Sequence, residues 1–128
     1  MVKKEFYSYS DYESLLNELV TKLKNDSRMK YIRNVYGIPR GGLPIAVHLS
    51  HFLKLNFLTN PFEKMIEETI IVDDIADTGL TLKKYGSLYL TATLFYKPKS
   101  EIKPNFYIEE TRNWIVFPWE KADEIPNR

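Results

Sequence analysis

Apolar side chains recur every three or four positions near the start of the chain. The repeat runs through Tyr12, Leu15, Leu16, Leu19, Val20 and Leu23. This is the spacing of residues on one face of an α-helix. Ser10 and Glu13 have the spacing of a capping box, in which each side chain accepts the other residue's free backbone N–H. The pattern predicts a helix over about residues 11–24 with its apolar face turned inward.

Shorter apolar runs farther along the chain predict strands at residues 35–38, 56–58, 69–72, 89–96, 106–108 and 114–117. A helical pattern begins near Pro44, and a short one covers residues 82–85. Strands that alternate with helices predict the α/β class, with a mostly parallel twisted sheet flanked by helices on both faces. We expect a single domain over residues 1–128, of which the polar residues 122–128 form a frayed tail.

Composition narrows the classes of function. The chain has 128 residues, no cysteine and a net charge of +1. Near-balanced charge argues against a nucleic-acid partner, although a few placed groups can still hold a small anion. The absence of cysteine excludes disulfides, thiolate zinc sites and a cysteine nucleophile. Because no apolar stretch approaches a membrane span and the start lacks the pattern of a signal peptide, we expect no membrane partner and a cytoplasmic location.

The most informative segment is acidic. Asp73 and Asp74 directly follow the predicted buried strand at 69–72, where two neighbouring carboxylates repel each other and lose hydration. They make sense if a cation or sugar hydroxyls satisfy them. The following Thr78-Gly79-Leu80-Thr81 combines hydroxyls with backbone N–H groups at a predicted helix start, which is typical of a phosphate cradle. The plainer alternative is a solvated loop followed by a helix cap.

A second candidate loop is Arg40-Gly41-Gly42, between a predicted strand and a predicted helix. Glycines let the backbone approach a ligand closely, and the guanidinium of Arg40 offers forked donors for phosphate oxygens. Taken alone, the loop is more simply explained as a tight turn. In a parallel sheet, however, both loops leave the carboxyl edge, where ligands bind.

These segments together resemble the type I phosphoribosyltransferases. Residues 71–81 are similar to that family's signature of apolar residues, two acids and a Thr-Gly-x-Thr turn. The Arg40 loop resembles the pyrophosphate loop of the xanthine/hypoxanthine-guanine branch. Lys97-Pro98 after a strand, and the run from Trp114 to Glu120, resemble the part of that branch that recognises 6-oxopurines.

The resemblance implies a role for each matching residue. It places the ribose of phosphoribosyl pyrophosphate on Asp73 and Asp74, directly or through Mg²⁺, and the 5′-phosphate on Thr78, Gly79, Leu80 and Thr81. It places the pyrophosphate on Arg40, Gly41 and Gly42. The purine is expected to meet Lys97 at O6, the ring of Trp114, the main chain of Ile115, and Asp77. Asp77 and Arg40 are the expected catalytic residues.

The implied reaction is Mg²⁺-dependent transfer of the phosphoribosyl group to N9 of hypoxanthine, guanine or xanthine, in a homodimer or homotetramer. Adenine and, less firmly, pyrimidines are disfavoured by Lys97 and Trp114. One departure from the family keeps an alternative open. Only residues 59–68 lie where the family carries a long flexible loop, so the protein is alternatively a sensor that binds phosphoribosyl pyrophosphate or nucleotide without turnover. The sequence also leaves open whether the Arg40–Gly41 peptide is cis.

Overall fold

The computed structural model describes residues 3–121, so the expected frayed tail at 122–128 lies outside the described residues. The α-helices are α1 (Tyr9–Lys24), α2 (Gly42–Phe52) and α3 (Leu80–Gly86). The strands are β1 (Lys4–Phe6), β2 (Asn34–Gly37), β3 (Asn56–Leu58), β4 (Thr69–Ala76), β5 (Leu90–Tyr96), β6 (Glu109–Glu110) and β7 (Trp114–Val116). Two 3₁₀ turns, Ser27–Met29 and Ile66–Glu68, precede β2 and β4.

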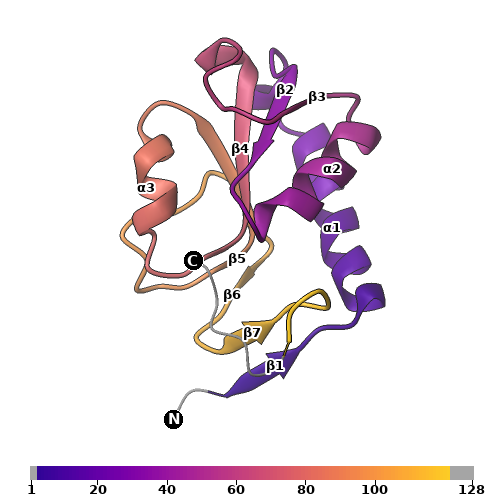
Figure 1. Ribbon diagram of the computed structural model, residues 1–128, viewed down its shortest axis with the longest axis vertical. Coiled ribbons are helices and arrows are strands. Elements are labelled where there is room, and N and C mark those ends of the chain that lie inside the picture. Colours follow the sequence, from indigo (N-terminus) through magenta and orange to yellow (C-terminus); the bar gives the residue numbers. More distant parts are fainter. Residues whose placement is uncertain (1–2, 122–128) are drawn as a thin grey trace.

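The strands form a parallel main sheet in the order β3-β2-β4-β5-β6, and β1 pairs with β7 in a separate two-stranded sheet that is also parallel. In Figure 1, β2 and β4 run toward the end of the molecule where the small sheet lies. The carboxyl edge of the main sheet therefore faces β1 and β7. The amino edge lies at the opposite end.

Helices cover both faces of the main sheet, as the alternation of elements predicts (Figure 1). On one face α1 and α2 pack a large apolar core, which includes Leu19, Leu49 and Phe95. On the other face the shorter α3 packs Leu82 against Ile71 and Tyr89. Because a buried side chain of this size contributes about 1.5–3 kcal/mol, the first face supplies most of the stability and holds the strands in place.

Several boundaries differ from the predictions. The helix predicted at 11–24 begins at Tyr9, and its capping box joins Ser8 to Asp11 instead of Ser10 to Glu13. The strand predicted at 106–108 is reduced to a bridge between Phe106 and Ala92, followed by the two-residue β6. The three-residue β1 was not predicted, because a segment this short carries no periodic pattern.

No helix within residues 3–121 has the length and apolar character needed to cross a membrane.

Candidate active site

Two buried carboxylates lie at the carboxyl end of β4. The register pairs Val72 with Gly37, the last residue of β2, so Asp73 and Asp74 lie just beyond the end of the neighbouring strand. Only 7% of Asp73 and 3% of Asp74 is exposed. This corrects the expectation that β4 ends at residue 72, because the strand continues through both acids to Ala76.

Local backbone groups stabilise these carboxylates. The N–H of Asp74 donates to Asp73 Oδ1 and the N–H of Ile75 donates to Asp74 Oδ1, each at 2.8 Å. Such bonds fix the orientation of each carboxylate and offset part of the cost of burying its charge. The plainer alternative of a solvated acidic loop is therefore wrong.

The loop that carries Arg40 lies directly against this pair. The N–H of Ile38 donates to the Val72 carbonyl at 2.9 Å, which ties the start of the loop to β4. A Cβ atom on Gly41 would overlap the carboxylate of Asp74, and one on Gly42 would come within contact of Asp73 Cα and overlap the Val72 carbonyl. The glycines are required here by close approach of the two segments. The loop contains one cis peptide bond, between Pro39 and Arg40, one residue before the peptide left open by the sequence.

The Thr-Gly turn follows at the start of α3. Gly79 has a φ of 82°, a left-handed conformation that glycine adopts readily, and Leu80 N–H donates to Thr78 Oγ1 at 3.3 Å. A small hollow of about 10 Å³, enough for one water molecule, is lined in part by Asp73, Thr78 and Thr81. The turn and Asp73 thus share one concave surface, and Thr78 and Leu80 are exposed beside it.

Lys97 lies at the end of β5 and points to Asp77. Its N–H donates to the Ala76 carbonyl at 2.9 Å, and its Nζ lies 3.3 Å from Asp77 Oδ1. Only 8% of Lys97 is exposed, so this lysine is not a solvated surface charge. Lys99 Nζ reaches the same oxygen at 3.3 Å from a more exposed position. Lys99 was not singled out in the sequence, although its position two residues after Lys97 was a usable signal.

Trp114 and Ile115 are placed on β7, in the small sheet. The N–H of Trp114 donates to the Lys3 carbonyl at 2.9 Å, and the Lys4 ammonium lies 5.9 Å from the centroid of the Trp114 ring. Ile115 is fully buried opposite Glu5 of β1, so the structure does not expose the main chain that was expected to meet the base. The N-terminal strand therefore supports the segment expected to bind the base, a role that sequence reasoning did not assign to it.

The two carboxylates at the carboxyl edge would hold a cation such as Mg²⁺ only together with oxygen atoms from a bound ligand or from water. Within residues 3–121 no three His, Cys, Asp or Glu side chains gather in the manner of a metal site. Mg²⁺ is commonly held by one or two carboxylates together with phosphate oxygens and waters. Asp73 and Asp74 supply carboxylates of the chemistry that this arrangement needs.

Comparison with known proteins agrees with this geometry. The chain is 30% identical over 117 residues to the xanthine-guanine phosphoribosyltransferase of Cereibacter sphaeroides, an alignment that covers 70% of each chain. It is 38% identical over 58 residues to the enzyme of the same name from Roseobacter denitrificans, covering 41% of this chain and 33% of that one. No family model matches the chain.

Solved structures show the same fold over nearly the whole chain. A purine phosphoribosyltransferase from Pyrococcus horikoshii superposes with a TM-score of 0.79 at 28% identity, covering 96% of this chain and 98% of that chain. The xanthine-guanine-hypoxanthine phosphoribosyltransferase of Helicobacter pylori gives a TM-score of 0.80 at 20% identity and covers 93% of both chains. These relationships show that the chain belongs to the purine phosphoribosyltransferases, enzymes of the type I phosphoribosyltransferase fold.

Proposed function

We propose that this protein transfers the 5-phosphoribosyl group of phosphoribosyl pyrophosphate to N9 of a 6-oxopurine: hypoxanthine, guanine or xanthine. The observation that carries the proposal is the packing of Gly41 against the buried carboxylate of Asp74. It brings an arginine–glycine loop suited to pyrophosphate next to carboxylates suited to ribose hydroxyls or a cation. The Thr-Gly turn beside Asp73 then receives the 5′-phosphate.

In the proposed reaction the bond between ribose C1 and the pyrophosphate oxygen breaks and a bond from C1 to purine N9 forms. The pyrophosphate keeps the electron pair, and N9 loses its proton. Arg40 and the backbone of Gly41 and Gly42 stabilise the departing negative charge. We propose Asp77 as the group that accepts or positions the purine proton, a role typically worth ~10²–10⁴ in rate.

Mg²⁺ is the proposed cofactor, held by Asp73 and Asp74, directly or through water. When bound, it would neutralise charge on the diphosphate and so favour its departure. The chain contributes two carboxylates of fixed orientation to this proposed site. Their backbone hydrogen bonds keep one oxygen of each in a defined direction.

Selection of the base is proposed to rest on Lys97 and the small sheet. A lysine ammonium only donates hydrogen bonds, so it favours the O6 acceptor of an oxopurine over the amino group of adenine. The ion pair with Asp77 holds that ammonium in place. The Trp114 ring is proposed to stack on the base, a contact of roughly 1–3 kcal/mol.

The experiment is to supply phosphoribosyl pyrophosphate and Mg²⁺ with hypoxanthine, guanine, xanthine, adenine or uracil in turn, and to measure nucleotide and pyrophosphate. Product from the 6-oxopurines alone is expected. Product with adenine or uracil would refute the assigned base selection.

The short 59–68 segment, with its single 3₁₀ turn, favours one alternative, a binding protein that senses the same ligands. Tight binding without product would establish that alternative instead.

We further propose that the chain forms a homodimer or homotetramer. Several large apolar side chains are exposed on three consecutive parts of the chain. They are Leu43 and Val47 on α2, Phe57 on the edge strand β3, and Phe62 and Met65 in the segment after β3. Such side chains are common where subunits meet. Light scattering at several protein concentrations tests this assembly, and a mass of one chain throughout would refute it.

A further inference from the structure

A second cavity lies at the amino edge of the sheet, away from the candidate active site. Its volume is about 590 Å³, within the range of small-molecule sites. Arg33, which lines it, directly precedes β2, whereas Arg40 follows the same strand. The cavity and the Arg40 loop therefore lie at opposite ends of β2.

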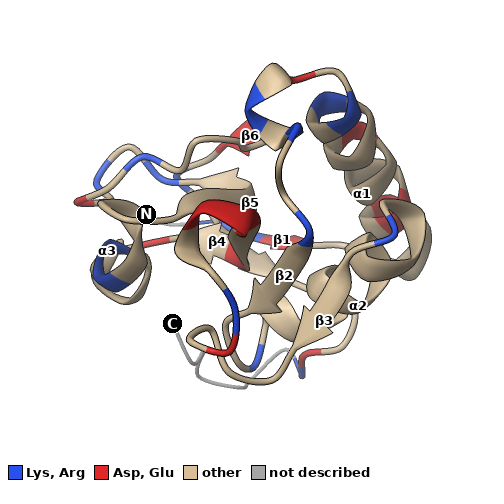
Figure 2. Ribbon diagram, turned by 90° about the horizontal axis from the view of Figure 1, so that it is seen from above, with Lys and Arg blue, Asp and Glu red and all other residues tan. Residues whose placement is uncertain are grey.

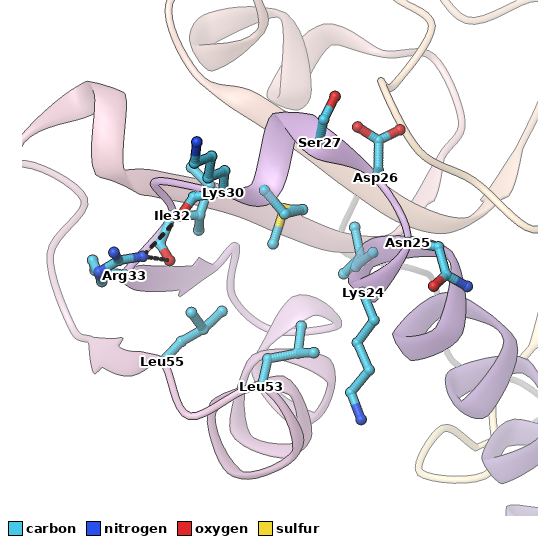
Figure 3. A pocket seen from close by; sticks show the side chains of 11 residues that line it. Lys24, Asn25, Asp26, Ser27, Lys30, Ile32, Arg33, Leu53 and Leu55 are labelled. Atoms are coloured by element: carbon cyan, nitrogen blue, oxygen red, sulfur yellow. Dashed lines mark hydrogen bonds between the residues drawn. The ribbon is translucent and has the colours of Figure 1, made fainter.

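The floor of this cavity is apolar. It is formed by Leu23, Met29, Ile32, Leu53 and Leu55. Leu23 and Ile32 are buried, and the other three are partly exposed while packing on the main core. In Figure 3 the side chains of Leu53 and Leu55 both point into the open space. The floor thus offers a ligand an apolar surface that is joined to the rigid core.

An unusual backbone conformation produces this arrangement. Lys54, between the two leucines, has a φ of 54°, the left-handed region that costs a residue with a Cβ about 1–2 kcal/mol. The N–H of Leu55 donates to the Ser50 carbonyl at 3.0 Å, which closes the end of α2 in a Schellman-type turn. The turn reverses the chain between the leucines and lets both contribute to one floor.

The rim of the cavity is positively charged. Lys24, Lys30 and Arg33 lie around it. The carboxylate of Asp26, which also lines the cavity, forms an ion pair with Arg28 at 2.9 Å. The Arg33 guanidinium donates to the carbonyls of Lys30 and Ile32, which fixes it at the edge. Within residues 3–121 neither Lys24 nor Lys30 forms an ion pair with a carboxylate. Figure 2, seen from the amino edge, shows the Lys and Arg positions of this region around the starts of β2 and β3.

We propose that this cavity is a second ligand site, which binds an organic phosphate with a flat apolar body. The apolar floor accepts the flat body, with the Met29 sulfur offering a favourable contact to an aromatic ring. The lysines and Arg33 hold the phosphate through charge-assisted hydrogen bonds. The site is separate from the proposed transferase site and is occupied independently of it.

The methionines of the chain allow a direct test. The sequence has three, and Met29 lines the cavity while Met65 is exposed in the 59–68 segment. The full chain is labelled with ¹³C at the methionine methyls and titrated with 1-naphthyl phosphate, with excess phosphoribosyl pyrophosphate and Mg²⁺ present. We expect a saturable shift of the Met29 methyl resonance, with Met65 unchanged. Inorganic phosphate alone is expected to bind at least tenfold more weakly.

A charge-reversed variant, with Lys24→Glu and Lys30→Glu, is expected to weaken binding of 1-naphthyl phosphate at least tenfold. Its control carries Lys64→Glu and Lys84→Glu, two exposed lysines that do not line the cavity, and should bind as the unmodified chain. All four positions are exposed, so both variants should keep the fold, which circular dichroism checks. An unmoved Met29 resonance, equal binding by both variants, or phosphate binding as tightly as the naphthyl ester would overturn the proposal. Failure of phosphoribosyl pyrophosphate to bind would be seen separately and bears only on the transferase site.

Discussion

At the scale of single residues, Lys97 carries the proposed choice of base. Lys97→Ala is expected to raise the KM for hypoxanthine roughly 10- to 150-fold, because a hydrogen bond to a charged group is worth about 1.5–3 kcal/mol. The Kd for phosphoribosyl pyrophosphate should stay within about twofold. Steady-state kinetics and calorimetry measure the two quantities.

The control for Lys97 is Lys99→Ala. Lys99 lies 3.3 Å from the same Asp77 oxygen but is largely exposed, so its removal should change the purine KM by less than about fivefold. If Lys97→Ala weakened both ligands equally while remaining folded, the assignment of Lys97 to the purine would be wrong.

Tyr12 is a buried residue whose ionisation affects stability. Its hydroxyl lies 2.7 Å from His48 Nδ1, and burial raises its pKa well above the ordinary value of 10.0. The folded state therefore retains the Tyr12 proton longer than the unfolded state. Its contribution to stability is fully present below pH 10 and is lost as the pH rises above 10, at up to about 1.4 kcal/mol per pH unit.

Tyr12→Phe is accordingly expected to flatten the fall in unfolding free energy between pH 10 and 11.5, measured by urea denaturation. At pH 7 it should cost about 0.5–1.5 kcal/mol through the lost hydrogen bond. Tyr31→Phe is the control, since Tyr31 is exposed and its removal should leave the slope unchanged. Equal slopes for all three proteins would contradict this account.

At the scale of elements, the start of α1 distinguishes two possible capping boxes. Both Ser8-x-x-Asp11 and Ser10-x-x-Glu13 have suitable spacing, and the structure forms the first. Ser8→Ala should therefore lower the unfolding free energy by about 1 kcal/mol, whereas Ser10→Ala, inside the helix, should change it by less than about 0.5 kcal/mol. Thermal and urea denaturation of the two variants give the comparison, and the reverse order would restore the box predicted from the sequence.

Three elements show why some boundaries were predictable and others were not. Apolar periodicity located α1 and α2, and an unbroken apolar run located β4, because burial decides where those residues lie. The apolar run ended β4 at residue 72, since this pattern treats a charged residue as the end of a buried strand. Pairing with Thr93 carries the strand past Asp73, and local N–H donors satisfy the carboxylates. Those compensating bonds are absent from any hydrophobic pattern.

At the scale of the whole molecule, the sheet topology brings together residues that are far apart in the sequence. The general rule that ligands bind beyond the carboxyl ends of parallel strands placed the Arg40 loop, the acidic pair and the Thr-Gly turn on one edge. Pairing of β1 with β7 joins segments about 110 residues apart, with Lys4 opposite Trp114. Neither segment signals the other in sequence, so the support that β1 gives to the segment proposed to bind the base is visible only in the folded structure.

We propose that the base binds at the small sheet and phosphoribosyl pyrophosphate at the main sheet. A change in the small sheet should therefore weaken binding of the base alone. Removal of residues 1–5 deletes the Lys3 carbonyl that accepts the Trp114 N–H and most of β1. We expect the KM for hypoxanthine to rise at least tenfold, while the Kd for phosphoribosyl pyrophosphate, which we propose is held at the main sheet, changes by less than about threefold. Lys3→Ala keeps the backbone carbonyl and should behave as the full chain. Trp114→Ala, which removes the ring and leaves the main sheet untouched, gives a second test if the truncated chain melts early. Unchanged purine kinetics in a folded truncated chain and in Trp114→Ala would show that the base binds elsewhere.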